Sequence, residues 1–91
     1  MIDLKANPFY LDNESISWVY ETLDEMTLEE KVGQLFCVLY RESTDDEVKS
    51  IHSIVSPGGG MFRPMPLIDV VKLSHKVQKA SKVPMLIAAN L

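Results

Sequence analysis

The sequence predicts an α/β fold built on about three parallel strands. Segments with helical periodicity alternate with short apolar runs along the chain, which is the pattern of strand–helix–strand units. The runs at 36–40 and 84–90 lack the polar alternation of a half-exposed strand, as is typical of parallel strands buried on both faces. Three such strands leave unprotected edges, so we expect either a very small domain or the opening of a larger one, with right-handed crossovers.

Composition excludes several classes of protein. The chain has 91 residues, of which 46% are hydrophobic, and a net charge of −4, which fits one ordinary globular domain. The nine basic residues are scattered, so we expect no nucleic-acid partner. No apolar run approaches the roughly 20 residues of a membrane span, and the N-terminus lacks a signal pattern; we expect no membrane partner and a cytoplasmic location. The single cysteine, Cys37, lies in an apolar run, and we expect a small buried side chain rather than a nucleophile.

The first third of the chain predicts two helices. Asp12 or Asn13 can cap a helix at 13–26, whose apolar residues recur at helical spacing: Ile16, Val19, Tyr20, Leu23 and Met26. Thr27 and Glu30 then stand in capping-box positions. They predict a second, short helix with Leu28, Val32 and Leu35 on one face.

The strands and the remaining helices follow in alternation. After the strand at 36–40, Thr44 and Glu47 form a second capping box, opening a helix with an inward stripe of Val48, Ile51 and Val55. A short strand at 60–63 precedes a helix that begins at Leu67 and carries an apolar face of Val70, Leu73, Val77 and Ala80. On that last helix we expect a solvated face formed by Lys72, Lys76 and Lys79, and a third strand follows at its end.

Most candidate chemical groups have a simpler structural explanation. The glycines at 58–60 match neither phosphate-binding glycine motif, and we expect them to stop a helix and allow close packing. His52 and His75 lack partners at metal-ligand spacing, so we expect surface histidines, no metal and no cofactor. The adjacent Asp45 and Asp46 suit a helix first turn, and no carboxylate pair stands in positions for glycoside chemistry.

Polar residues at strand ends remain as site candidates. Ligands of parallel α/β folds bind beyond the carboxyl ends of the strands, where Arg41, Arg63 and Asn90 follow the three predicted strands. Asn90 offers donors and an acceptor without a charge to desolvate, which suits the binding of hydroxyl groups. The alternative is that Asn90 is a turn residue.

Three segments together resemble glycoside hydrolase family 3. "MTLEEKVGQLF" at 26–36 is similar to the motif near the start of its members, "VSPGGGMFRPM" at 55–65 to their Gly-Gly strand, and "LSHKVQKASKVPMLIAANL" at 73–91 to their next helix and strand. The resemblance implies that the chain is a fragment of a (β/α)₈ TIM barrel. In it, 1–26 form an N-terminal extension and first helix, and 27–91 form the first three β/α units. Asn90 takes the place of a family residue, usually Asp, that binds hydroxyls of the terminal sugar.

The resemblance also implies a retaining β-glycosidase that removes terminal β-linked N-acetylglucosamine or glucose from oligosaccharides. The family's nucleophile and its acid/base lie beyond residue 91, so this chain is expected to carry no catalytic residue and to be inactive alone. Its expected partners are a carbohydrate substrate in the full-length protein and, through exposed strands, further copies of the fragment. The alternative is a stand-alone α/β interaction module without catalysis.

Overall fold

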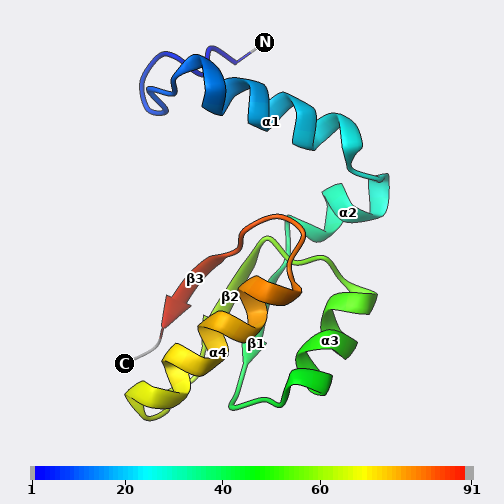
Figure 1. Cartoon of the computed structure of the whole chain (residues 1–91), viewed down its shortest axis with the longest axis vertical. Coiled ribbons are helices and arrows are strands. Elements are labelled where there is room, and N and C mark those ends of the chain that lie inside the picture. The colour runs from blue at the N-terminus through cyan, green and yellow to red at the C-terminus, as the bar shows by residue number, and fades with distance from the viewer. Residues whose placement is uncertain (1, 90–91) are drawn as a thin grey trace.

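A computed structural model describes residues 2–89 of the chain and confirms the predicted order of elements (Figure 1). Helices and strands alternate after two N-terminal helices, as the periodicity predicts. Their bounds are α1 Asn13–Glu25, α2 Leu28–Gly33, β1 Cys37–Tyr40, α3 Asp45–Ile54, β2 Gly59–Phe62, α4 Leu67–Ala80 and β3 Leu86–Ala89.

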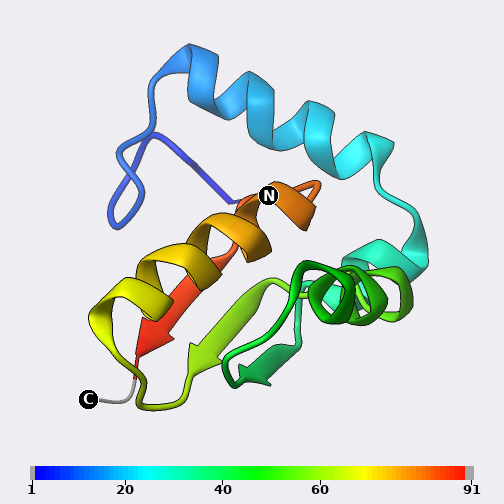
Figure 2. The same cartoon turned by 60° about the horizontal axis from the view of Figure 1, so that its bottom comes forward.

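The three strands form one parallel sheet in the order β1-β2-β3. Cys37 of β1 pairs with Gly59 of β2, which pairs with Leu86 of β3. The carboxyl ends of all three strands therefore meet at the same edge, and Figure 2 shows the three arrows pointing the same way. The α/β class with parallel strands is confirmed.

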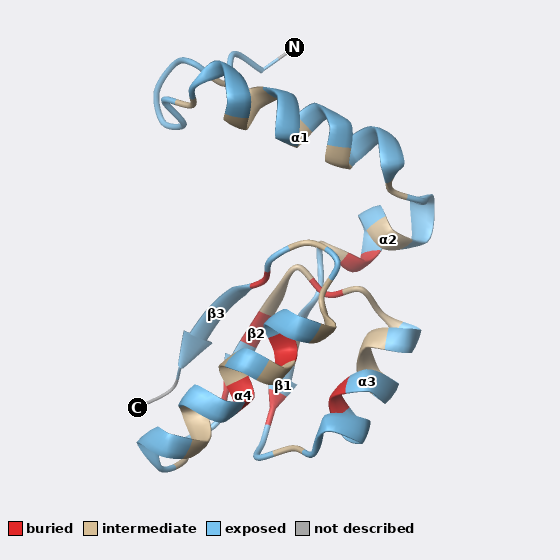
Figure 3. Ribbon diagram, in the orientation of Figure 1, coloured by how far each residue is buried: buried red, intermediate tan, exposed pale blue. Residues whose placement is uncertain are grey.

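The core lies between the sheet and the helices α3 and α4. Successive side chains of a strand point to opposite faces, and Tyr40 and Phe62, which occupy paired positions, are both completely buried on the helix side. The two helices contribute Val48, Leu73 and Val77 to this cluster, as their helical stripes predict. Figure 3 shows the buried residues gathered between these layers.

The opposite face of the sheet is open, which corrects the prediction of strands buried on both faces. Leu39 is 54% exposed, its partner Met61 41% and Leu86 82%. Cys37 also lies exposed on β1, so the prediction of a buried cysteine is wrong. The physical reason is that no described element covers this face, which we call the inner face.

The N-terminal helix stands apart from the sheet. No residue of α1 is buried, and Trp18 is 52% exposed. Figure 1 shows α1 beyond the sheet, joined to it through α2. No described helix is long and apolar enough to cross a membrane.

Side-chain caps fix where the helices begin. Asp12 accepts a hydrogen bond from the Ser15 amide at the start of α1, and at α3 both bonds of the predicted Thr44–Glu47 capping box are present. At α2 only half of the predicted box forms. Thr27 accepts from the Glu30 amide, but the Glu30 carboxylate pairs with a lysine elsewhere in the fold instead of returning to the cap.

The glycine-rich segment packs closely but does not end a helix. α3 ends at Ile54 with Val55 as its cap, before the glycines, so the predicted helix stop is wrong. A Cβ atom on Gly58 would collide with the Gln34 carbonyl oxygen, and one on Gly60 would lie 2.9 Å from the Tyr40 ring. The predicted close packing is therefore confirmed.

Candidate functional site

The carboxyl edge of the sheet brings two of the predicted site residues to the same level. The register pairs Tyr40 with Phe62, and the Arg63 amide donates to the Tyr40 carbonyl oxygen at 2.9 Å. The sheet pairing thus continues for one residue past the strands. Arg41 and Arg63 follow the paired residues directly and are both exposed.

The two arginines lie directly past the ends of β1 and β2. Tyr40 and Phe62 point toward the helices, whereas Leu39 and Met61, one position earlier on each strand, point to the other face. Asn90 follows β3 at the corresponding place in the sequence, but it lies outside the described residues. Its predicted role therefore stays a prediction.

A buried aromatic pair supports this edge from the helix side. The rings of Tyr40 and Phe62 meet edge to face with their centroids 5.9 Å apart, an arrangement that aromatic quadrupoles favour. The Tyr40 hydroxyl lies 2.6 Å from His52 Nε2. Desolvation raises the pKa of Tyr40 above its usual value, and charge interaction with Cys37 adds to this effect.

The prediction of a surface position is wrong for His52, which is half-buried between α3 and the end of α4. Its Nδ1 faces the Ser81 hydroxyl at 3.5 Å, and that hydroxyl donates to the Val77 carbonyl. Burial lowers the pKa of His52, and a hydrogen bond to the Ala80 backbone partly opposes the shift. These contacts fit a neutral ring that accepts from Tyr40 and donates toward α4.

The inward position of His52 had a signal in the sequence. His52 stands four residues after the buried Val48, on the side that α3 turns toward the core. His75, in contrast, is exposed on α4 as predicted. Lys76 departs from its predicted solvated face because its ammonium group donates to the Ser43 carbonyl oxygen at 2.9 Å.

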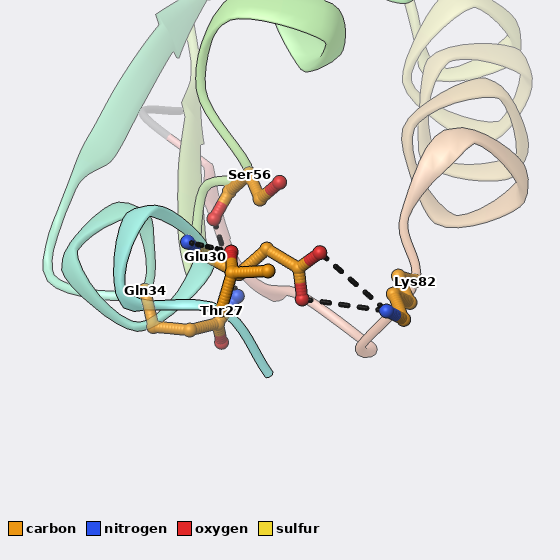
Figure 4. A network of polar contacts seen from close by, with 5 residues as sticks. All are labelled: Thr27, Glu30, Gln34, Ser56 and Lys82. Atoms are coloured by element: carbon orange, nitrogen blue, oxygen red, sulfur yellow. Dashed lines mark hydrogen bonds and ion pairs between the residues drawn. The ribbon is translucent and has the colours of Figure 1, made fainter. Parts of the chain in front are cut away.

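A second polar network lies at the amino edge of the sheet (Figure 4). The Lys82 ammonium lies 3.4 Å from the Glu30 carboxylate, and Gln34 donates to the Ser56 carbonyl oxygen at 3.2 Å. These groups line a cavity of about 180 Å³ that His52 also borders. In parallel α/β barrels the amino edge serves stability rather than chemistry, so we assign this network a structural role.

The potential metal ligands of the described residues do not cluster. Within residues 2–89 there is no group of three or more His, Cys, Asp or Glu side chains that could hold a metal ion. Asp45 and Asp46 are exposed in the first turn of α3, as predicted.

Comparison with known proteins identifies a similar enzyme. The sequence matches no family model. It is 42% identical over 91 residues to a "Beta-N-acetylglucosaminidase/beta-glucosidase" of Cellulomonas fimi, a match that covers 100% of this chain and 16% of the relative.

Solved structures give the same result for the fold. The structure of "Beta-glucoside phosphorylase BglX bound to 2FGlc" superposes with a TM-score of 0.82 and 33% identity, covering 92% of this chain and 15% of that one. A second structure of beta-glucoside phosphorylase BglX gives a TM-score of 0.78 at 33% identity, with 92% and 14% covered. The chain thus spans only about a sixth of the length of these proteins. In sequence and in fold, it matches the N-terminal segment of a family 3 glycoside hydrolase, as its motifs predict.

Proposed function

We propose that this chain forms the N-terminal barrel segment of a larger enzyme that cleaves terminal β-linked N-acetylglucosamine or glucose from oligosaccharides. The observation that supports this most is the 42% identity to the Cellulomonas fimi enzyme, which extends over every residue of the chain. In such an enzyme, this segment would contribute one wall of the substrate pocket. The nucleophile and the acid/base would come from the rest of the protein, because the described residues hold no suitable carboxylate pair.

Asn90 would bind the sugar in this proposal. Its side chain can donate to one hydroxyl and accept from another, and its place after β3 is where parallel α/β folds position ligand-binding residues. Asn90→Ala in an active enzyme should lower kcat/KM by at least about tenfold, which corresponds to about 1.4 kcal/mol of transition-state binding. Unchanged kinetics in a folded variant would favour the turn-residue alternative.

The acceptor of the sugar is a separate question. A hydrolase transfers the glycosyl group to water, whereas BglX is a beta-glucoside phosphorylase. The similarity to both named activities supports cleavage of a β-glycoside with either acceptor. The alternative of a stand-alone interaction module predicts no contribution to catalysis in any context.

A chimera distinguishes the enzyme segment from the interaction module. The chain would replace the 91 matched residues of the Cellulomonas fimi enzyme, and hydrolysis of nitrophenyl β-N-acetylglucosaminide and β-glucoside would be measured. We expect turnover in the chimera and none in a control from which the matched segment is deleted or in the 91-residue chain alone. A chimera that unfolds as cooperatively as the parent enzyme but has no turnover would contradict the proposal, and so would turnover by the chain alone.

A further inference from the structure

One side chain of α4 binds both backbone groups of the residue that precedes β3. Gln78 Nε2 donates to the Met85 carbonyl oxygen at 2.9 Å, and the Met85 amide donates to Gln78 Oε1, also at 2.9 Å. A side-chain amide offers a donor and an acceptor together, so the pair of bonds fixes orientation as well as distance. The Ser81 amide donates to the Gln78 carbonyl oxygen at 3.1 Å, which ties the end of α4 into the same unit.

These bonds lie where the chain enters the sheet. Met85 is buried, with 5% of its surface exposed, and the next residue, Leu86, donates its amide to the Gly58 carbonyl oxygen at 3.0 Å. Two successive amides thus have different partners, one in α4 and one beside β2. Without Gln78, the backbone groups of Met85 would need other partners, because a buried backbone group that lacks a hydrogen bond is costly.

Little else fixes the position of β3 along the sheet. Within residues 2–89, β3 is an edge strand that pairs only with β2, and all four of its residues are exposed. A shift of one residue would move the end of the strand by about 3.3 Å and turn every side chain to the other face. The register of this strand therefore depends strongly on the anchor at its start.

We propose that Gln78 is a positioning residue, which sets β3 in register and thereby places the binding group that follows it at the carboxyl edge. This inference rests on the proposed function, in which that group is Asn90. Gln78 binds at the amino end of the strand, so it acts through the backbone of β3 rather than on the substrate. Such positioning affects the rate, because a misplacement of about 1 Å can cost about 100-fold.

The substitution Gln78→Glu tests this role at constant side-chain size. The introduced carboxylate can still accept from the Met85 amide, but it cannot donate to the Met85 carbonyl oxygen. In the chimera described above, kcat/KM for nitrophenyl β-N-acetylglucosaminide should fall about fivefold, the factor expected for one hydrogen bond of ordinary net strength. The matched control is Gln34→Glu, which removes the bond to the Ser56 carbonyl oxygen at the amino edge and should keep kcat/KM within about twofold.

A double-mutant cycle with Asn90→Ala separates positioning from stability. If Gln78 acts through Asn90, Gln78→Glu should cost about fivefold when Asn90 is present and less than about twofold when Asn90→Ala is already made, since the effects of coupled residues do not add. An equal loss in both backgrounds would show a structural role alone and would overturn the proposal. A loss below about twofold in the first background, or equal losses in Gln78→Glu and Gln34→Glu, would also overturn it.

Hydrogen–deuterium exchange of the same chimeras gives a readout that does not need turnover. Gln78→Glu should speed exchange in the segment 85–89 about fivefold, while Gln34→Glu should leave that segment unchanged. Unchanged exchange in Gln78→Glu, or faster exchange spread over the whole protein, would overturn the proposal.

The two proposals fail in different ways. If the unsubstituted chimera is active and Gln78→Glu matches it in rate, this inference fails and the proposed function stands. An inactive unsubstituted chimera would instead count against the proposed function, and the exchange result would then decide alone whether Gln78 fixes β3.

Discussion

The contacts of His52 make the stability of this chain depend on pH. The ring accepts a hydrogen bond from Tyr40 through Nε2, at 2.6 Å, and protonation would remove that acceptor. Burial lowers the pKa of His52 in the folded chain, whereas in the unfolded chain the pKa of histidine is near its usual value of 6.5. Below that value the unfolded state binds more protons than the folded state. The free energy of unfolding should therefore fall as the pH falls from 6.5 toward the folded pKa, and level off below it.

The size of this effect has an upper limit. If the folded state bound no proton at all, lowering the pH from 7.5 to 5.5 would cost about 1.4 kcal/mol for one histidine with an unfolded pKa of 6.5. His52 is only half-buried, and solvent screening reduces the difference. We therefore expect a cost below this limit.

Two matched variants isolate the contribution of His52. His75 is exposed on α4, so His75→Gln should keep the wild-type pH dependence, whereas His52→Gln should remove the part that His52 contributes, which is at most about 1.4 kcal/mol. The assay is urea unfolding at pH 7.5 and 5.5, followed by far-UV circular dichroism, with equal m-values required in both variants. The reasoning is refuted if the two variants have the same pH dependence. It is also refuted if the wild-type chain becomes more stable on acidification through His52, because that sign requires a protonated ring in the folded state.

Two further predictions test the packing of the sheet. Gly33→Ala should lower the free energy of unfolding by about 1–3 kcal/mol, because its Cβ would lie 2.6 Å from the Ser56 backbone oxygen. The control Gly59→Ala, whose Cβ meets only ordinary contacts, should change the free energy of unfolding by less than about 1 kcal/mol. Equal melting curves for the two variants would contradict the expected clash. The 91-residue chain should associate through its inner face, so Leu39→Lys should lower the mass measured by light scattering. The control Leu67→Lys, on the exposed start of α4, should leave that mass unchanged. A wild-type monomer at micromolar concentration would contradict this expectation.

The helix-facing half of this fold was predictable because local signals and packing agree. Thr44 and Glu47 satisfy the first turn of α3 whatever surrounds it, and the stripe that includes Val48 faces the sheet simply by its 3.6-residue period. Glu30 shows the limit of such signals. The local pattern predicts a bond to its own helix cap, but a lysine brought near by the end of α4 competes for the carboxylate, and nothing local encodes that contact.

The sequence predicts where the candidate site lies, but not which of its residues stand at the same level or contact one another. Chain order and strand type place Arg41 and Arg63 at the carboxyl edge, yet only the register shows that they stand at the same level. His52 was assigned to the surface because a histidine among polar helix residues resembles a surface residue, although its spacing from Val48 indicates the inward side of the helix. Its bond to Tyr40 joins residues on different elements, so no spacing along the chain reveals it.

The strands are apolar on both faces, although the described residues bury only one of these faces. Leu39, Met61 and Leu86 occupy the positions that would be polar in a sheet built to face water on one side, and together they leave a contiguous apolar surface of the kind that mediates association. The helices already cover the other side, so the inner residues are accounted for only by a further layer of protein. In the larger enzyme that we propose, that layer would come from the same polypeptide. For the isolated chain, we expect another copy to supply it.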